Sequence, residues 1–143
     1  LTVSVTDKTA WSLSVEGETV LKDNTVSMAI DERTLGPDAK VVKVRKGSVS
    51  EHIVAPFYRQ AEFDAAYNWL TLKMKGDWSL ELRAYDDGVA YRFVTNRPDI
   101  RKVYFETAEF NFAQPYDMLV PYVNKRNDGD RYYEAWKGAS KYS

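Results

Sequence analysis

Alternation of apolar and polar residues dominates this chain, and it is clearest in the stretch RAYDDGVAYRF at residues 83–93. On both sides of the centre of this stretch, apolar side chains recur at every second position: Leu80, Leu82, Ala84, Val89, Tyr91 and Phe93. A period of two predicts strands with one face turned toward a core. The centre is Asp86-Asp87-Gly88, where glycine can adopt a positive φ and aspartates can bond their own backbone. The sequence therefore predicts two strands joined by a tight hairpin.

The same alternation predicts strands along most of the chain. They are expected at residues 1–6, 11–15, 19–21, 26–30, 39–46, 67–75, 103–112 and 116–123. Within one of these strands, three side chains are expected to face the core: Leu70, Leu72 and Met74. Short strands at such spacing are typical of a sandwich or barrel, and helical periodicity is weak throughout. We therefore predict one mostly antiparallel all-β domain over residues 1–143, either a sandwich or a barrel.

Turn residues and irregular stretches separate the predicted strands. The polar run Lys22-Asp23-Asn24 is expected to end one strand before the next begins. Gly36-Pro37 predicts a loop over residues 31–38, and residues 48–60 show less regular alternation. After residue 124 the chain becomes polar, and residues 132–143 carry no strong pattern. We expect a domain that is cut off at its C-terminus.

Composition narrows the class of protein. The 143 residues are 44% hydrophobic and 29% charged with a net charge of −1, which suits one globular domain and does not predict nucleic acid or an anionic membrane as partner. The absence of cysteine excludes disulfides, thiol nucleophiles and thiolate metal sites within the chain. No apolar run approaches the roughly 18 to 20 residues of a membrane span, and since no basic region is followed by an apolar stretch, we expect no signal peptide within these residues. Because the chain opens at Leu1 with a strand pattern, we expect a processed protein or an excised piece of a longer one.

Aromatic residues are frequent, at 14% of the chain with 10 Tyr and 4 Trp. Tyr and Trp combine large apolar faces with a polar group. They suit β-sheet cores, and they equally suit surfaces on which sugars stack. Composition does not choose between these two uses.

Few residues suggest catalysis. His52 is the only histidine, no Gly-x-Ser-x-Gly motif occurs, and a structural role is expected for a single histidine between Glu51 and Ile53. Asp86 and Asp87 are adjacent turn residues that point apart and stay hydrated, so we assign them no catalytic role. We name no catalytic residue in this chain.

Two charged clusters have a non-catalytic explanation. The basic residues Lys40, Lys43, Arg45 and Lys46 suit a solvated or edge-protecting face, and no glycine-rich loop supports phosphate binding. Asp128 and Asp130 flank Gly129 and could offer oxygens to calcium, but their spacing falls short of an EF-hand loop. A plain turn explains them, and we name no metal ligand.

Five stretches occur in an order that resembles one known domain. They are APFYRQ at 55–60, YNWLTLKMKG at 67–76, RAYDDGVAYRF at 83–93, AEFNF at 108–112 and LVPY at 119–122. Together they resemble the N-terminal domain of glycoside hydrolase family 97, over nearly the whole chain. The resemblance implies a β-super-sandwich of the galactose mutarotase type, followed in the full protein by a catalytic (β/α)8 barrel and a small β domain. Family members are bacterial α-glycosidases that act on α-glucosides or α-galactosides.

The resemblance also implies where the chemistry lies. The catalytic carboxylates belong to the barrel, and the N-terminal domain's share of the calcium ligands is expected beyond Ser143. Calcium is therefore expected for the full-length enzyme but not for this chain, which alone is expected to be inactive. By resemblance, the location is the periplasm or the exterior of a Gram-negative bacterium.

The segment 124–136 follows the last matched strand and is our candidate for a loop near the barrel. Asn124, Tyr132 and Trp136 are the candidate substrate-binding residues, although packing of the aromatic side chains against the barrel is the favoured role. The expected partners are thus the protein's own barrel and an oligo- or disaccharide substrate. If strands of the sandwich are missing, exposed edges would also favour an edge-strand dimer of the fragment.

The sequence is compatible with three functions. The leading hypothesis is a non-catalytic N-terminal β-sandwich that supports the barrel of an α-glycosidase and lines its cleft. The alternative is a free-standing carbohydrate-binding or interaction module, which predicts glycan binding by this chain alone. A sugar mutarotase is the weakest hypothesis, because such chemistry needs a positioned acid and base and His52 is the only histidine.

Overall fold

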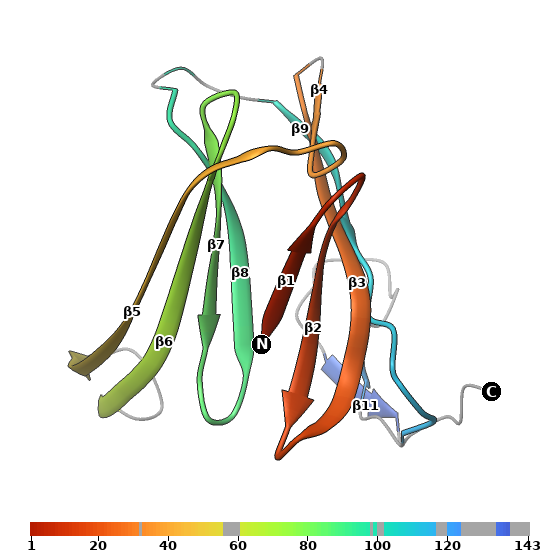
Figure 1. Cartoon of the computed structure of the whole chain (residues 1–143). Helices are drawn as coiled ribbons and strands as arrows, with labels where there is room; N and C mark the ends of the chain where they lie inside the picture. The colour runs from red at the N-terminus through yellow and green to blue at the C-terminus, as the bar shows by residue number, and fades with distance from the viewer. Residues whose placement is uncertain are drawn as a thin grey trace, which may run out of the picture.

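The computed structural model describes residues 1–31, 33–55, 61–97, 99 and 102–116, together with the backbone of two short strands at 120–123 and 134–137. All regular structure in these residues is β-strand (Figure 1). The predicted all-β antiparallel sandwich is confirmed. No helix in the described part of the chain could cross a lipid bilayer.

Two sheets face each other (Figure 1). The first sheet contains β1 (Thr2–Val5), β2 (Thr9–Val15), β3 (Glu18–Ile30) and β4 (Arg33–Leu35) in that order, with β9 (Val103–Ala108) paired to β3. The second sheet contains β5 (Val41–Val54), β6 (Glu62–Met74), β7 (Trp78–Ala84) and β8 (Val89–Thr95). A separate antiparallel pair is formed by β10 (Val120–Val123) and β11 (Glu134–Lys137).

The core lies between the two sheets and is built by the alternation seen in the sequence. The first sheet contributes Trp11, Leu21, Val26, Ile30 and Leu35, and the second contributes Leu72, Met74, Trp78, Leu80 and Leu82. The predicted inward positions of β6 and β7 are therefore correct, with Leu70 half-buried beside them. Burial of these side chains is the main term that stabilises the fold.

The predicted hairpin joins β7 to β8. Ala84 pairs with Val89, and the Tyr85 amide donates to the Gly88 carbonyl at 2.8 Å. Gly88 itself does not adopt a positive φ; among the described residues, the glycines that do are Gly17, Gly36 and Gly76. The turn therefore closes without the left-handed glycine that the sequence suggested.

The predicted break at Lys22-Asp23-Asn24 is wrong, because β3 runs without interruption from Glu18 to Ile30. Asp23 has a φ of 52°, and the pairing of β3 with β2 shifts register nearby. Asn24 is fully buried, donates to the Trp11 carbonyl at 2.9 Å and accepts from the Asn111 amide at 2.6 Å. The polar run is thus a bulge inside a strand, and its asparagine ties together three segments of the sheet.

Four other boundaries also differ from the predictions. The loop predicted at 31–38 contains the short strand β4, and the region 132–143 contains β11. The irregular stretch 48–60 continues β5 as far as Val54, and β6 starts five residues earlier than predicted, at Glu62 rather than residue 67. Their alternation was hard to see because this part of the sheet buries little on either face.

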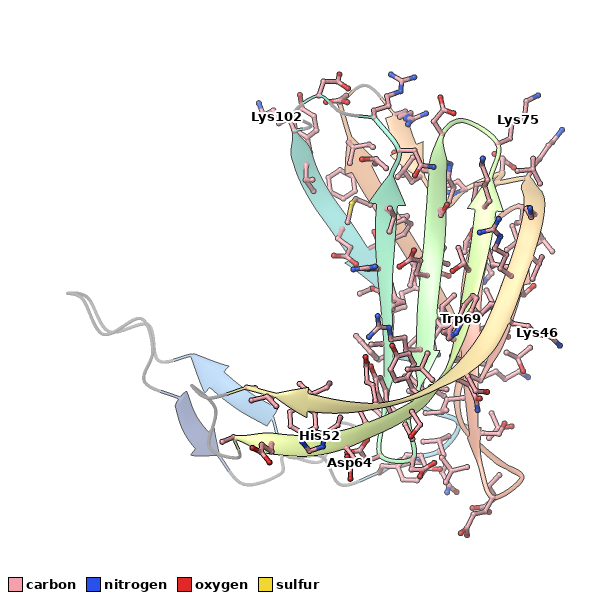
Figure 2. The ribbon with its side chains drawn as sticks, turned by 90° about the vertical axis from the view of Figure 1, so that its left-hand side faces the viewer. Lys46, His52, Asp64, Trp69, Lys75 and Lys102 are labelled. Carbon is pink, nitrogen blue, oxygen red and sulfur yellow. The ribbon has the colours of Figure 1, made fainter. Side chains whose placement is uncertain are left out.

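The long strands β5 and β6 project beyond the rest of their sheet. β7 pairs with β6 only from Asn68 to Met74, whereas β5 stays paired with β6 as far as Glu62. The remainder is a two-stranded arm that bends away from the sandwich (Figure 2). We call residues 49–54 and 62–67 the arm.

Candidate functional site

The predicted substrate-binding residues lie outside what the structure describes. Asn124 and Tyr132 are not among the described residues, and Trp136 is described only as a backbone position in β11, paired with Pro121 of β10. Asp128 and Asp130 are likewise outside the described residues. The assignment of Asn124, Tyr132 and Trp136 to the substrate stays a prediction.

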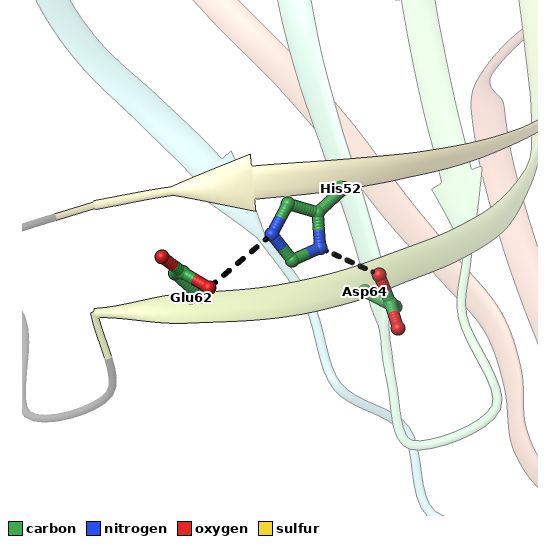
Figure 3. Close-up of polar contacts among 3 residues, drawn as sticks. All are labelled: His52, Glu62 and Asp64. Atoms are coloured by element: carbon green, nitrogen blue, oxygen red, sulfur yellow. Dashed lines mark hydrogen bonds and ion pairs between the residues drawn. The ribbon is translucent and has the colours of Figure 1, made fainter.

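His52 lies on the arm between two carboxylates (Figure 3). It pairs in register with Asp64, so its Nδ1 meets the Asp64 Oδ1 at 2.8 Å, while its Nε2 lies 3.6 Å from the Glu62 Oε2. All three side chains are more than half exposed. The carboxylates contact opposite nitrogens of the ring, so the three groups cannot converge on one metal ion. Within the described residues there is no group of three or more His, Asp or Glu side chains arranged to hold a metal.

The basic cluster is spread over an edge strand. Register places Lys46 beside Leu70 on the inner face of the sheet, whereas Arg45 lies beside Thr71 on the outer face. All of its residues on β5 are exposed. Cations that point to opposite faces do not form one anion site, which is in keeping with the expected solvated edge.

A network of aromatic and charged side chains covers the outer face where the arm leaves the sheet. The Arg83 guanidinium lies 4.5 Å from the centre of the Tyr67 ring, and the Tyr85 ring lies 5.0 Å from the same ring. The Tyr67 hydroxyl donates to the Glu51 carboxylate at 3.3 Å. Desolvation, together with the Glu51 carboxylate, raises the pKa of Tyr67 above its ordinary value. These contacts hold Tyr67 and Arg83 in one arrangement.

Trp69 lies beside this network, on the face of the sheet turned to the viewer in Figure 2. It is directly opposite Gly47 on β5 and Arg83 on β7. A Cβ built on Gly47 would lie 2.9 Å from two carbons of the indole, so the ring occupies the space that a side chain would fill. A depression of about 240 Å³ adjoins the ring, with Val49, Thr71, Glu81 and Arg83 at its border. No local sequence pattern predicts this site, because the pairing of Trp69 with Gly47 is visible only once the register of β5 and β6 is known.

A larger opening lies between the sheets on the side of β1 and β5. Its volume is about 540 Å³, and Leu1, Lys46, Ser48, Asn68, Leu70 and Leu82 line it. The Ser48 hydroxyl donates to the Asn68 side-chain oxygen at 2.6 Å. Polar residues therefore stand at inward positions here, which explains why the two sheets do not close over them. We call this opening the inter-sheet cleft.

The opposite side of the sandwich is joined by a side-chain hydrogen bond. The Tyr91 hydroxyl on β8 donates to the Glu106 carboxylate on β9 at 2.9 Å. Burial of the phenol, followed by this bond, raises the pKa of Tyr91 from 10.0 to about 12. The contact holds a neutral tyrosine between the sheets and is structural.

Comparison with known proteins identifies a domain family. All of residues 1–143 match the family model described as glycosyl-hydrolase 97 N-terminal. A retaining alpha-galactosidase from Bacteroides thetaiotaomicron is 38% identical over 130 residues, which cover 90% of this chain and 20% of that protein. The chain thus spans about a fifth of this relative's length.

Solved structures show the same fold at low sequence identity. A beta-arabinopyranosidase superimposes with a TM-score of 0.75 and 20% identity, over 98% of this chain and 24% of that one. A glycoside hydrolase family 97 enzyme from Pseudoalteromonas sp. strain K8, in complex with panose, gives a TM-score of 0.69 and 17% identity, over 85% of this chain and 20% of its own. The match to the family model confirms the predicted family, and the solved structures confirm the predicted fold.

Proposed function

Because the chain belongs to the glycosyl-hydrolase 97 N-terminal family, we propose that it is the non-catalytic N-terminal domain of a larger bacterial α-glycosidase. In that enzyme it supports a (β/α)8 barrel and lines one wall of the substrate cleft. The observation that carries the proposal is the family match over residues 1–143, together with the small share of the relative that the chain covers. The relative's name favours α-galactosides over α-glucosides as substrate.

Surfaces of the domain support a role within a larger protein. Apolar side chains are exposed on two outer strands, namely Val41, Val42 and Val44 on β5 and Val103, Tyr104 and Phe105 on β9. Exposed apolar groups and a free strand edge favour contact with further polypeptide. The barrel that follows in the complete enzyme is the partner we assign to them.

Calcium binding is proposed only for the complete enzyme. Glu62 and Asp64, the two carboxylates that contact the histidine, lie against opposite nitrogens of His52 and do not converge on one ion. The described residues hold no group of three or more His, Asp or Glu side chains that could bind a metal, and we place the calcium ligands elsewhere in the polypeptide. We also assign the enzyme to the periplasm or the cell exterior, on the resemblance to bacterial glycosidases.

The cleft-lining role is tested by kinetics of the complete enzyme. We expect Trp136→Ala, and to a smaller degree Tyr132→Ala and Asn124→Ala, to raise KM for an α-galactoside several-fold with a smaller change in kcat, because uniform binding is lost. Phe63→Ala removes an exposed aromatic ring from β6 and serves as the matched control. An unchanged KM in all three variants would show that these residues do not contact the substrate in the cleft.

A second copy of the chain is the other partner that the β5 edge could take. An edge-strand dimer of residues 1–143 would pair β5 with β5, since only β6 is paired to this strand in the described part of the molecule. Sedimentation of the isolated chain tests this arrangement. A monomer at high concentration contradicts the dimer and leaves the edge to the rest of the enzyme.

A further inference from the structure

The outer face of the second sheet presents one aromatic ring lying against the backbone. Trp69 is half-buried and packs against Gly47, whose missing side chain leaves room for the indole. Any other residue at 47 would place a Cβ 2.9 Å from the ring carbons Cε2 and Cζ2. The glycine therefore lets the indole approach the sheet surface, with one side of the ring toward the strand.

The neighbouring rings and charges are already fixed. Arg83 covers Tyr67 at 4.5 Å, and its Nη1 also donates to the Tyr85 hydroxyl at 3.3 Å. Glu81 is bound by Arg92, with Oε2 lying 2.6 Å from Nη2 and 2.7 Å from Nε. Because these contacts already order the side chains, the side chains lose little further conformational entropy when a ligand binds.

The depression beside Trp69 combines the two kinds of surface that a sugar requires. Its volume is about 240 Å³, and it joins the indole to Glu81, Arg83 and the Thr71 hydroxyl. An aromatic ring offers an apolar face, and the flanking groups include a guanidinium donor and a carboxylate acceptor. The Glu81 carboxylate is paired with Arg92 and borders the depression together with the Arg83 guanidinium, so the lining has no large excess of either charge and suits a neutral ligand.

We infer that this face, comprising Gly47, Trp69, Thr71, Glu81 and Arg83, is a carbohydrate-binding site for a neutral hexopyranose unit of a glycan. The apolar C–H face of the pyranose stacks on Trp69, Arg83 donates to its hydroxyls and Glu81 accepts from them. The site lies on the sheet's outer face and is separate from the proposed cleft at Asn124, Tyr132 and Trp136. It gives the enzyme a means of holding polymeric substrate in addition to its active site.

Binding is measured on the complete enzyme by affinity electrophoresis in gels that contain galactomannan or amylopectin. We expect wild-type protein to be retarded by one of these polymers, and Trp69→Ala to lower the affinity roughly tenfold, the scale of one lost aromatic contact. Gly47→Val keeps the indole but displaces it from the sheet, and it should weaken binding similarly. Phe63→Ala, which removes an exposed ring from the arm, outside the site, should bind as wild type.

Two further measurements separate this site from the active site and from a folding defect. Hydrolysis of 4-nitrophenyl α-galactoside should keep its kcat/KM in Trp69→Ala, because this small substrate does not reach the outer face. Trp69→Phe should restore most of the polymer binding, since it returns an aromatic ring. A wild-type enzyme that binds polymer without hydrolysing the aryl galactoside would contradict the proposed activity while leaving this site intact.

Hydroxyl-radical footprinting of the wild-type enzyme tests the site without any variant. Trp69 should be oxidised in the free enzyme, and more slowly when the bound polymer is present. Protection of Trp69 in the free enzyme would show that the remainder of the protein covers this face, and it would overturn the inference. Equal polymer binding by wild type, Trp69→Ala and Gly47→Val would overturn it as well.

Discussion

The two sides of the sandwich are closed in different ways. On the side of β8 and β9, the Tyr91 hydroxyl reaches across to Glu106 and joins the two sheets. On the side of β1 and β5, polar inward residues such as Ser48 and Asn68 line a cleft of about 540 Å³. The first side has a hydrogen bond that joins the two sheets, whereas the second side has an open cleft between them; apolar residues are exposed on an outer strand at both sides, on β9 and on β5. The comparison shows that the inward residues of each side decide whether the sheets are joined there: Tyr91 reaches Glu106 on one side, whereas Ser48 and Asn68 bond to each other within one sheet on the other.

The largest contrast is expected between a core residue and its counterpart on the open side. Leu80 is 1% exposed and Val44 is 56% exposed, although both belong to the second sheet. Leu80→Ala should lower the free energy of unfolding of the domain by about 3 kcal/mol, because it leaves a cavity between the sheets. Val44→Ala should cost below about 0.5 kcal/mol in the isolated domain. Hydrogen exchange of the β7 amides measures both effects, and equal costs would contradict the assignment of the core.

A second contrast uses two asparagines. Asn24→Ala should cost about 2 kcal/mol of unfolding free energy, because it leaves the buried Trp11 carbonyl and Asn111 amide without their side-chain partner. Asn68→Ala, in the inter-sheet cleft, removes an exposed bond to Ser48 and should cost little. Exchange rates of the β3 amides report the first variant. A stable Asn24→Ala domain would show that the bulge is not held by this side chain.

The hydrogen bond on the closed side predicts a pH dependence. Tyr91 has a folded pKa of about 12 against an ordinary value of 10.0, so the folded domain holds its phenolic proton more tightly than the unfolded chain does. The resulting stability is present below pH 10 and is lost as the pH rises through 12. After allowance for solvent screening of this half-exposed group, we expect a loss of about 1 kcal/mol. Tyr91→Phe should remove that part of the decline in alkaline denaturation curves, and an unchanged slope would contradict the assignment.

The smallest effect is expected on the arm. Asp64→Asn removes the charge of a carboxylate that meets His52 at 2.8 Å in an exposed position. Exposed ion pairs contribute little, so the unfolding free energy should fall by less than about 0.5 kcal/mol, and by less still at high salt. A loss as large as that of Asn24→Ala would show that the arm is held by this pair rather than by its strand hydrogen bonds.

Sequence patterns predicted the closed centre of the molecule better than its open side. The hairpin at 83–93 and the inward positions Leu72 and Leu80 followed from alternation, because those strands bury one face and expose the other. The strands of the arm were not predicted in full, because solvent reaches both of their faces and burial therefore imposes no alternation of apolar and polar residues on them. The polar run at Asp23 predicts a strand end but forms a bulge, and its composition cannot distinguish the two because both place polar residues in a row.

Candidate sites were harder to predict, since they depend on register. His52 meets Asp64 and Glu62 only because β5 and β6 pair residue 52 with residue 64. The Trp69 indole can lie against the sheet only because the residue paired with it on β5 is Gly47, which has no side chain. Neither pairing can be read from local sequence, whereas the family resemblance rests on ordered motifs and was confirmed over the whole chain.

The most direct test of the proposed function is hydrolysis by the polypeptide encoded by the complete reading frame, measured on 4-nitrophenyl α-galactoside and α-glucoside beside residues 1–143 alone. The account predicts turnover of at least one substrate by the complete polypeptide and none by residues 1–143. Turnover by the isolated chain would place catalysis in this domain. A reading frame that stops within a few dozen codons after Ser143, or a complete polypeptide that cleaves neither substrate, would contradict the glycosidase assignment for this protein.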